Sequence, residues 1–197
     1  AGLGDNLVEG WRAGGPPLAE TGGGRVLVVG GLLSDGGSSG LYAAAFAVAL
    51  GADEVVCVSP DAGLRAHAHA YGARVIPSAD VDGQLEDLGA FDVTVDTSGS
   101  ADGLAMALRS CGPSAVCTCT AGAVHRGAPP ALPVYEMYMN TVTFRTGWVH
   151  TRALIDAPLD ALVDGAFDPT SIADVHSFDE AEAAFAEPFT KLILRRW

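Results

Sequence analysis

The sequence predicts an α/β fold in which a parallel sheet is covered by helices on both faces. Short valine-rich runs alternate along the chain with longer segments of helical character, and this alternation is typical of βαβ units. The clearest run, Val26–Val29, is apolar at every position, as parallel strands buried on both faces are. A loop rich in glycine and serine and then an apolar helix follow it. We therefore expect a doubly wound parallel sheet of about six strands with right-handed crossovers.

The expected strands are short runs bounded by glycine, proline or polar residues, which is typical of strands joined through helices. In chain order they are Val26–Val29, Glu54–Val58, Arg74–Ile76, Phe91–Thr97, Ala115–Thr120, Thr141–Gly147 and Leu192–Leu194.

The expected helices lie between these strands and on either side of them. Gly14-Gly15-Pro16-Pro17 should end the first helix, and Ser177 should cap the last one. In chain order the helices are Asn6–Ala13, Gly40–Leu50, Ala62–Tyr71, Leu104–Ser110, Pro133–Met139, Leu154–Val163 and Asp179–Ala186.

The composition excludes several classes of partner. The chain of 197 residues has 24 Asp and Glu against 11 Lys and Arg, a net charge of −13, which argues against nucleic acid or an anionic membrane as partner. No apolar run approaches the ~18–20 residues of a membrane span, and no signal-peptide pattern opens the chain. The four cysteines show no disulfide-framework spacing, so we expect reduced thiols and a cytoplasmic location.

The loop after the first strand has the composition of a phosphate-binding loop. Gly30 closes the strand and Gly37-Ser38-Ser39-Gly40 opens the helix, whose N-terminal N–H groups and partial positive charge suit a pyrophosphate. Gly30 and Gly40 are ten positions apart, about five more than in Gly-x-Gly-x-x-Gly, and Asp35 adds an unfavourable carboxylate. This insertion either leaves the phosphate site intact or marks a remodelled or lost site.

Seven segments carry a family resemblance: Arg25–Gly30, Gly40–Asp53, Gly72–Ile76, Phe91–Gly99, Ala115–Thr120, Met137–Gly147 and Ser177–Leu194. Together they resemble the medium-chain dehydrogenase/reductase superfamily, the zinc alcohol dehydrogenase-like enzymes. The resemblance covers only the nucleotide-binding part of that pattern, without the N-terminal GroES-like catalytic domain that supplies the zinc ligands. The chain is thus expected to be an excised domain, a natural truncation, or a subunit completed by another polypeptide.

The resemblance implies a division into three parts. Residues 1–20 are expected to form a connecting helix and turn, and residues 21–150 a Rossmann-type dinucleotide-binding domain. Residues 151–197 are expected to form C-terminal helices and a final strand packed on that domain. In the family, the tail folds back onto the catalytic domain.

The resemblance also implies a cofactor, NAD(P), and a set of residues that bind it. NAD-binding members place an acidic residue at the end of the second strand, where this chain has Ser59. Its absence favours NADP over NAD, with Arg65 as the nearest cation for a 2′-phosphate, although Asp61 would repel that group. The expected cofactor-binding residues are Gly30, Gly37, Ser38, Ser39, Gly40, Ser59, Arg65, Ser98 and Thr120.

Catalytic residues are left open, with three polar candidates. Ser98 and Thr120 each follow a strand at the carboxyl edge of the sheet, where ligands bind in open α/β folds. These two residues and His150 are the candidates for substrate activation. No metal is expected: Cys117 and Cys119, near Cys111 and His125, should be small buried side chains rather than ligands.

Two other enzyme mechanisms are disfavoured. Ser38 lies in a formal Gly-x-Ser-x-Gly pattern, with Asp96 and His125 or His150 after it. However, no strand runs straight into this serine, as a nucleophile elbow requires. The single lysine, Lys191, has no tyrosine four residues before it, which excludes a Tyr-x-x-x-Lys mechanism.

Two functions from different classes remain. The first is a truncated or split alcohol-dehydrogenase-like oxidoreductase that uses NAD(P), and no zinc in this part, to transfer hydride to or from a small alcohol or carbonyl substrate. The second is a repurposed Rossmann scaffold, either a non-redox enzyme or a non-catalytic ligand-binding or partner subunit without dinucleotide. The resemblance implies a homodimer through residues 141–150, because in family dimers this edge strand pairs with its twin across a two-fold axis, and pairing would also hide an apolar edge. A separate GroES-like catalytic subunit is a further expected partner.

Overall fold

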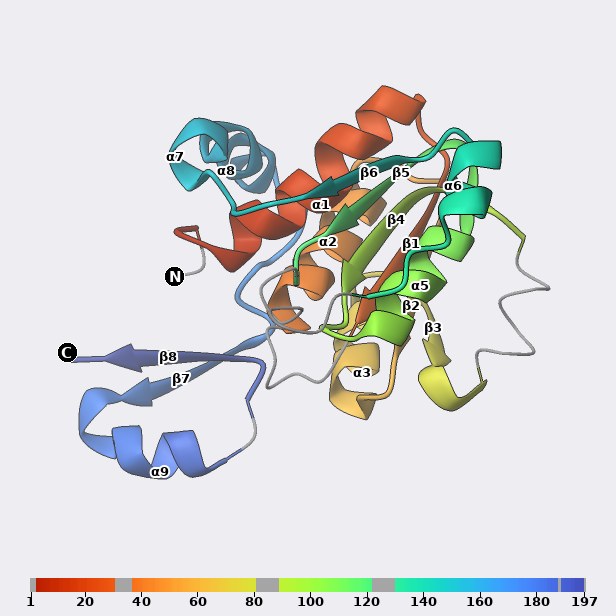
Figure 1. Ribbon diagram of the computed structural model, residues 1–197. Helices are drawn as coiled ribbons and strands as arrows, with labels where there is room; N and C mark the ends of the chain where they lie inside the picture. The colour runs from red at the N-terminus through yellow and green to blue at the C-terminus, as the bar shows by residue number, and fades with distance from the viewer. Residues whose placement is uncertain (1–2, 31–36, 81–88, 122–129, 188, 197) are drawn as a thin grey trace.

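The computed structural model describes residues 3–30, 37–80, 89–121, 130–187 and 189–196 (Figure 1). Its centre is a six-stranded parallel sheet in the order β3-β2-β1-β4-β5-β6, which is the doubly wound order of dinucleotide-binding domains. The predicted Rossmann-type fold is therefore confirmed. The strands are β1 (Arg25–Gly30), β2 (Glu54–Ser59), β3 (Arg74–Pro77), β4 (Phe91–Thr97), β5 (Cys111–Cys119) and β6 (Thr143–Thr146).

Helices cover both faces of this sheet, because the side chains of a buried parallel strand are apolar on both sides. Val28 of β1 packs with α1, α2 and α3 on one face, and Leu27 packs with α5 and α6 on the other. Figure 1 shows these two layers. The helices are α1 (Asn6–Thr21), α2 (Gly37–Ala49), α3 (Ala62–Ala70), α5 (Ala101–Arg109), α6 (Val134–Met139), α7 (Thr151–Leu154), α8 (Asp156–Val163) and α9 (Ala181–Ala186), with single turns at Ser78–Asp80 and Phe178–Glu180.

The prediction that Gly14-Gly15-Pro16-Pro17 ends the first helix is wrong, because α1 continues to Thr21. Tertiary packing outweighs the local helix breakers here. A Cβ on Gly14 would lie 2.9 Å from the carbonyl oxygen of Ala43, so the glycines let α1 pack closely against α2. Leu18, beyond the prolines, is buried in the same core.

The C-terminal region differs from the prediction in two ways. The helix expected at Leu154–Val163 is divided into α7 and α8. A strand that was not expected, β7 (Ala173–Ser177), pairs in parallel with β8 (Lys191–Arg195) as a separate two-stranded sheet. Ser177 caps the next turn in a capping box with Glu180, so the predicted cap is confirmed.

The β7–α9–β8 unit lies to one side of the six-stranded sheet (Figure 1). Phe185 and Phe189 stack edge to face within it. The division of the chain at residues 20 and 150 stays a prediction. Within the described ranges, no helix is long and apolar enough to cross a bilayer.

Candidate functional site: the carboxyl edge of the central sheet

The site begins where β1 and β4 end side by side. The chain leaves β1 toward β2 and β3 on one side and returns to β4, β5 and β6 on the other. This reversal of strand order creates a crevice at the carboxyl ends, the usual place for a ligand in such sheets. Gly30 and Thr97, the last residues of the two strands, lie opposite each other.

The start of α2 packs tightly against this edge. A Cβ on Gly40 would lie 2.6 Å from the Thr97 hydroxyl oxygen, so only glycine allows the helix to come this close to β4. The predicted glycine thus has the role of the third glycine of the dinucleotide fingerprint, which is close packing of helix and strand. The intervening residues 31–36, with Asp35, lie outside the described ranges.

Helix α1 holds α2 in place through a contact that the sequence reading missed. The Asn6 side-chain amide donates a hydrogen bond to the Ser38 hydroxyl, and Ser38 is buried. Ser39 is partly buried, and its carbonyl oxygen lies 2.9 Å from a Cβ built on Gly10. A buried, hydrogen-bonded Ser38 adds to the argument against a serine nucleophile.

Ser59 and Arg65, two of the expected cofactor-binding residues, meet at the end of β2. Arg65 donates to the Ser59 carbonyl oxygen at 2.7 Å, and its side chain is only partly buried. The Asp61 carboxylate accepts the Leu64 backbone N–H at 3.0 Å and caps α3. A cation therefore stands at this strand end, while the neighbouring carboxylate is engaged in capping.

Ser98 and Thr120 are brought together by Asp96, which was not among the predicted site residues. The buried Asp96 carboxylate accepts the Ser98 hydroxyl at 2.6 Å and the Ser98 N–H at 3.0 Å. Thr120 donates its backbone N–H, at 2.9 Å, to the Asp96 carbonyl oxygen. The signal was the Asp-Thr-Ser-Gly turn, in which a short acidic side chain binds its own backbone two residues on.

The third catalytic candidate, His150, lies elsewhere. It precedes α7 and is exposed, and the next residue, Thr151, donates to the Gly4 carbonyl oxygen. No hydrogen bond joins His150 to Ser98 or Thr120 within the described ranges. The structure thus groups two of the three candidates.

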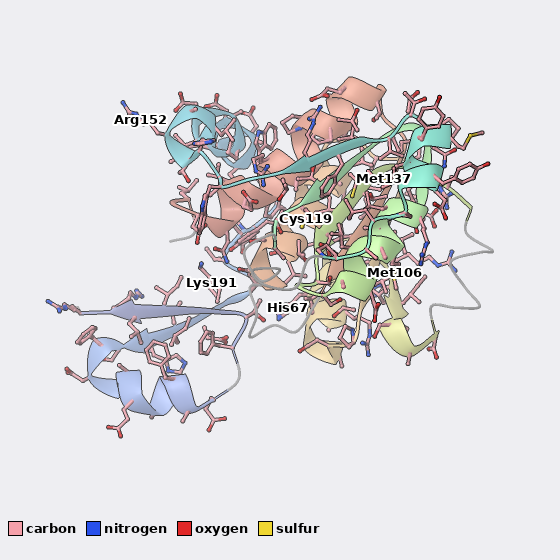
Figure 2. All side chains as sticks on the ribbon, in the orientation of Figure 1. His67, Met106, Cys119, Met137, Arg152 and Lys191 are labelled. Carbon is pink, nitrogen blue, oxygen red and sulfur yellow. The ribbon has the colours of Figure 1, made fainter. Side chains whose placement is uncertain are left out.

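Two of the buried thiols, Cys119 and Cys57, have raised pKa values. Cys119, on β5 (Figure 2), donates to Asp96 at 3.2 Å, and burial, with the Asp96 charge, raises its pKa to about 12. Burial also raises the pKa of Cys57 to about 12. Thiols of this kind stay protonated at neutral pH, whereas metals bind thiolates. The described residues contain no group of three or more His, Cys, Asp or Glu suited to a metal, and His125 lies outside them.

Solved structures share this architecture at low sequence identity. An alcohol dehydrogenase zinc-binding domain protein from Burkholderia ambifaria superposes with a TM-score of 0.84 at 20% identity, over 98% of this chain and 54% of that one. Benzyl alcohol dehydrogenase from Acinetobacter calcoaceticus superposes with a TM-score of 0.83 at 20% identity, over 98% of this chain and 55% of that one. A short chain alcohol dehydrogenase from E. coli, complexed with NADH, superposes with a TM-score of 0.75 at 12% identity, over 92% of this chain and 53% of that one.

This chain therefore spans about half the length of the dehydrogenases that it resembles. No curated protein matches it. Residues 40–163 match the family of zinc-binding dehydrogenases, and these residues run from Gly40, in the first turn of α2, to the end of α8. The chain belongs to the zinc-binding dehydrogenase family of the medium-chain dehydrogenase/reductase superfamily.

Proposed function

We propose that this chain is the nucleotide-binding part of an NAD(P)-dependent oxidoreductase of the alcohol dehydrogenase type. The observation that carries the proposal is the packing of Gly40 on Thr97 at the crevice between β1 and β4. A bound nicotinamide supplies the hydride chemistry. The chain's own residues bind and orient the dinucleotide, with the start of α2 facing the pyrophosphate.

Ser59 and Arg65 support NADP as the preferred dinucleotide. A carboxylate at position 59 would accept both hydroxyls of an unmodified ribose, and serine cannot replace its charge. Arg65 is held at this strand end by its bond to the Ser59 carbonyl, and its guanidinium suits a 2′-phosphate. Because Asp61 caps α3, its carboxylate is partly neutralised by the helix N-terminus.

Ser98 and Thr120 are suited to positioning the nicotinamide end and the substrate. The Ser98 hydroxyl donates to Asp96 at 2.6 Å and its oxygen accepts the Ser100 backbone N–H at 3.1 Å, which leaves at most one acceptor position for a ligand. A hydroxyl of a small alcohol substrate matches that position. We assign no zinc step to the described residues, because they contain no group of three or more His, Cys, Asp or Glu suited to a metal, and we assign no general acid.

We propose that the substrate-activating groups come from a GroES-like domain, in the same or another polypeptide. The β7–α9–β8 unit supports this proposal, since a two-stranded parallel sheet with exposed Val175 and Phe178 is rarely stable alone.

All four cysteines are free and buried, which supports a reducing compartment such as the cytoplasm.

A second candidate function is a Rossmann scaffold without dinucleotide, favoured by the ten-position spacing from Gly30 to Gly40. A thermal-shift titration with NAD, NADH, NADP and NADPH separates the two. At a free concentration of a hundred times its dissociation constant, a dinucleotide adds ~2.7 kcal/mol to the free energy of unfolding. The melting temperature then rises by roughly 5–10 °C. The absence of a shift with all four would reject the cofactor proposal and leave the scaffold.

Replacing Arg65 tests the NADP preference. We expect Arg65→Ala to weaken NADPH binding about 10- to 100-fold, the loss of a charge-assisted hydrogen bond, and to leave NADH binding nearly unchanged. Isothermal titration with both ligands measures the effect. Arg109→Ala, at the exposed end of α5, is the matched control. An equal loss for both dinucleotides would refute the 2′-phosphate role.

We further propose that two copies of the chain pair through β6. This strand is one of the two edges of the six-stranded sheet, and an edge strand presents backbone groups that a second strand can satisfy. An isologous pair of edges makes one continuous sheet around a two-fold axis.

A further inference from the structure

Helices α1 and α2 lie side by side on one face of the sheet and run in the same direction (Figure 1). Asn6 contacts Ser38 near the start of both helices, and further along both, the ring centroids of Trp11 and Phe46 are 5.0 Å apart. Because Gly40, in the first turn of α2, packs on the end of β4, both helix N-termini lie at the carboxyl edge of the sheet. Two partial positive charges therefore lie at this edge, which favours an anion there.

The hydrogen bond between the two helices has a defined polarity. The Asn6 side-chain amide donates, and the Ser38 hydroxyl oxygen accepts. A serine hydroxyl has one proton and two acceptor positions, so this bond leaves the Ser38 proton for another group. No residue in the described ranges accepts that proton, although Ser38 is only 2% exposed. A buried donor without an acceptor is unfavourable, which favours an acceptor from outside these residues.

The position of Ser38 directs its side chain toward the ligand end of α2. Ser38 is the second residue of this helix, and in an α-helix each Cα–Cβ bond is tilted toward the N-terminus. The side chain therefore leans toward the end at which the unpaired backbone N–H groups of the first turn point. The Ser38 hydroxyl can add one more donor to those N–H groups.

The charged side chains of α1 beside this contact do not oppose an anion. Glu9, one turn beyond Asn6, is buried and forms an ion pair with Arg12, whose Nε–H donates to the Glu9 Oε2 at 2.9 Å. Asp5, which precedes α1, is exposed, so water and salt screen its charge. Glu9 and Arg12 together carry no net charge, whereas the chain as a whole carries −13.

We propose that Asn6 is a positioning residue, which orients the Ser38 hydroxyl so that it donates its proton to the pyrophosphate of the bound dinucleotide. This inference rests on the proposed function, because it requires a dinucleotide at the start of α2. Asparagine suits the role because its amide donates to the serine oxygen. An aspartate at position 6 can only accept, so it takes the serine proton for itself and removes a charge-assisted hydrogen bond from the pyrophosphate.

Isothermal titration of the full chain with NADPH and with adenosine 2′-phosphate, which lacks the pyrophosphate, tests this role. We expect Ser38→Ala to weaken NADPH binding about 10- to 100-fold, the loss of a hydrogen bond to a charged group. Asn6→Asp should weaken it at least as much, because the carboxylate takes the serine proton and repels the pyrophosphate. Neither substitution should change the affinity for adenosine 2′-phosphate. If the wild type prefers NADH, NADH and adenosine replace this pair of ligands.

Asn6→Ala separates the orientation of the hydroxyl from the effect of charge. Without its partner the Ser38 hydroxyl rotates freely, so Asn6→Ala should weaken NADPH binding less than Ser38→Ala does. In the Ser38→Ala background the same substitution should have no further effect, because the group that Asn6 orients is gone.

Asn140→Asp is the matched control for the added charge. Asn140 follows α6 and precedes β6, so this variant adds the same charge at the amino edge of the sheet and should leave both affinities unchanged. Asn6→Asp should keep α1 intact, since an acidic side chain in the first turn stabilises a helix. Circular dichroism checks that each variant is folded.

The outcomes separate the role of Asn6 from the proposed function. A wild type that binds no dinucleotide overturns both. If the wild type binds NADPH and either Asn6→Asp or Ser38→Ala binds it equally well, the role of Asn6 is overturned and the proposed function stands. Equal losses for NADPH and adenosine 2′-phosphate also overturn the role, because the contact then only holds α1 against α2.

Discussion

At the scale of single residues, the polar groups inside the sheet decide where the site forms. Asp96 of β4 is buried, its carboxylate binds Ser98 and the Cys119 thiol, and its carbonyl oxygen accepts the Thr120 N–H. A buried carboxylate with several donors is stabilised as a unit. These bonds hold the two polar loops beside each other at the carboxyl edge.

Thr94 and Thr118 show the contrast between a satisfied and an unsatisfied buried hydroxyl. The Thr94 hydroxyl oxygen lies 3.3 Å from the Cys111 sulfur, and the two groups share a hydrogen bond. Thr118, on the adjacent strand β5, is fully buried, and its hydroxyl has no hydrogen-bond partner among the described residues.

We expect Thr118→Val to stabilise the protein by about 1 kcal/mol, because valine has the same shape and removes the cost of burying an unpaired hydroxyl. Chemical denaturation of the two proteins measures the difference. Thr94→Val, which removes a paired hydroxyl, is the matched control and should destabilise. A loss of stability in Thr118→Val would indicate that the hydroxyl is bonded in solution.

At the scale of elements, the contact between α1 and α2 depends on glycine. A Cβ on Gly10 would lie 2.6 Å from the Tyr42 Cβ and 2.8 Å from the Ala43 nitrogen. No rotation of a side chain relieves a clash with backbone, so alanine at this position pushes the helices apart. Because Asn6 of α1 binds Ser38 of α2, such a shift also disturbs the phosphate-facing end of α2.

We expect Gly10→Ala to destabilise the protein by about 1–3 kcal/mol, the usual effect of overpacking. The melting temperature and the dinucleotide affinity should fall together. Gly4→Ala is the control, since nothing lies within 4 Å of a Cβ there, and it should change neither. A neutral Gly10→Ala would mean that the two helices have room to separate.

At the scale of the whole molecule, burial of titratable groups sets the alkaline limit of stability. Burial raises the pKa of Cys57 and Cys119 from 9.0 to about 12, and that of Tyr42 from 10.0 to about 12. A group whose pKa is raised by folding holds its proton in the folded state after the unfolded chain has lost it. Its stabilising contribution is complete below the unfolded pKa and is lost as the pH rises toward 12.

The free energy of unfolding should therefore fall above about pH 9 for the two cysteines and above about pH 10 for Tyr42, by up to about 1.4 kcal/mol per pH unit for each group. Urea denaturation at a series of pH values measures the slope. Cys57→Ala should make it shallower by about one such contribution above pH 9 and leave it unchanged near pH 7. If the slope is the same in both proteins, ionisation of Cys57 is not coupled to unfolding.

The sequence by itself determined the central sheet. The valine-rich runs placed β1, β2 and β4 within one residue of their ends, because a strand buried on both faces must be apolar at every position. Gly40 was identifiable for a different reason. The site needs a residue without a side chain where the helix meets the strand.

Only the tertiary structure decided which residues act together and where marginal elements end. Asn6 and Ser38, 32 residues apart, and Asp96 and Cys119, 23 residues apart, meet through contacts that no local pattern encodes. The continuation of α1 through Pro16 and Pro17 and the formation of β7 depend on neighbouring elements. Local propensity is worth at most a few kcal/mol, and packing against the rest of the chain outweighs it.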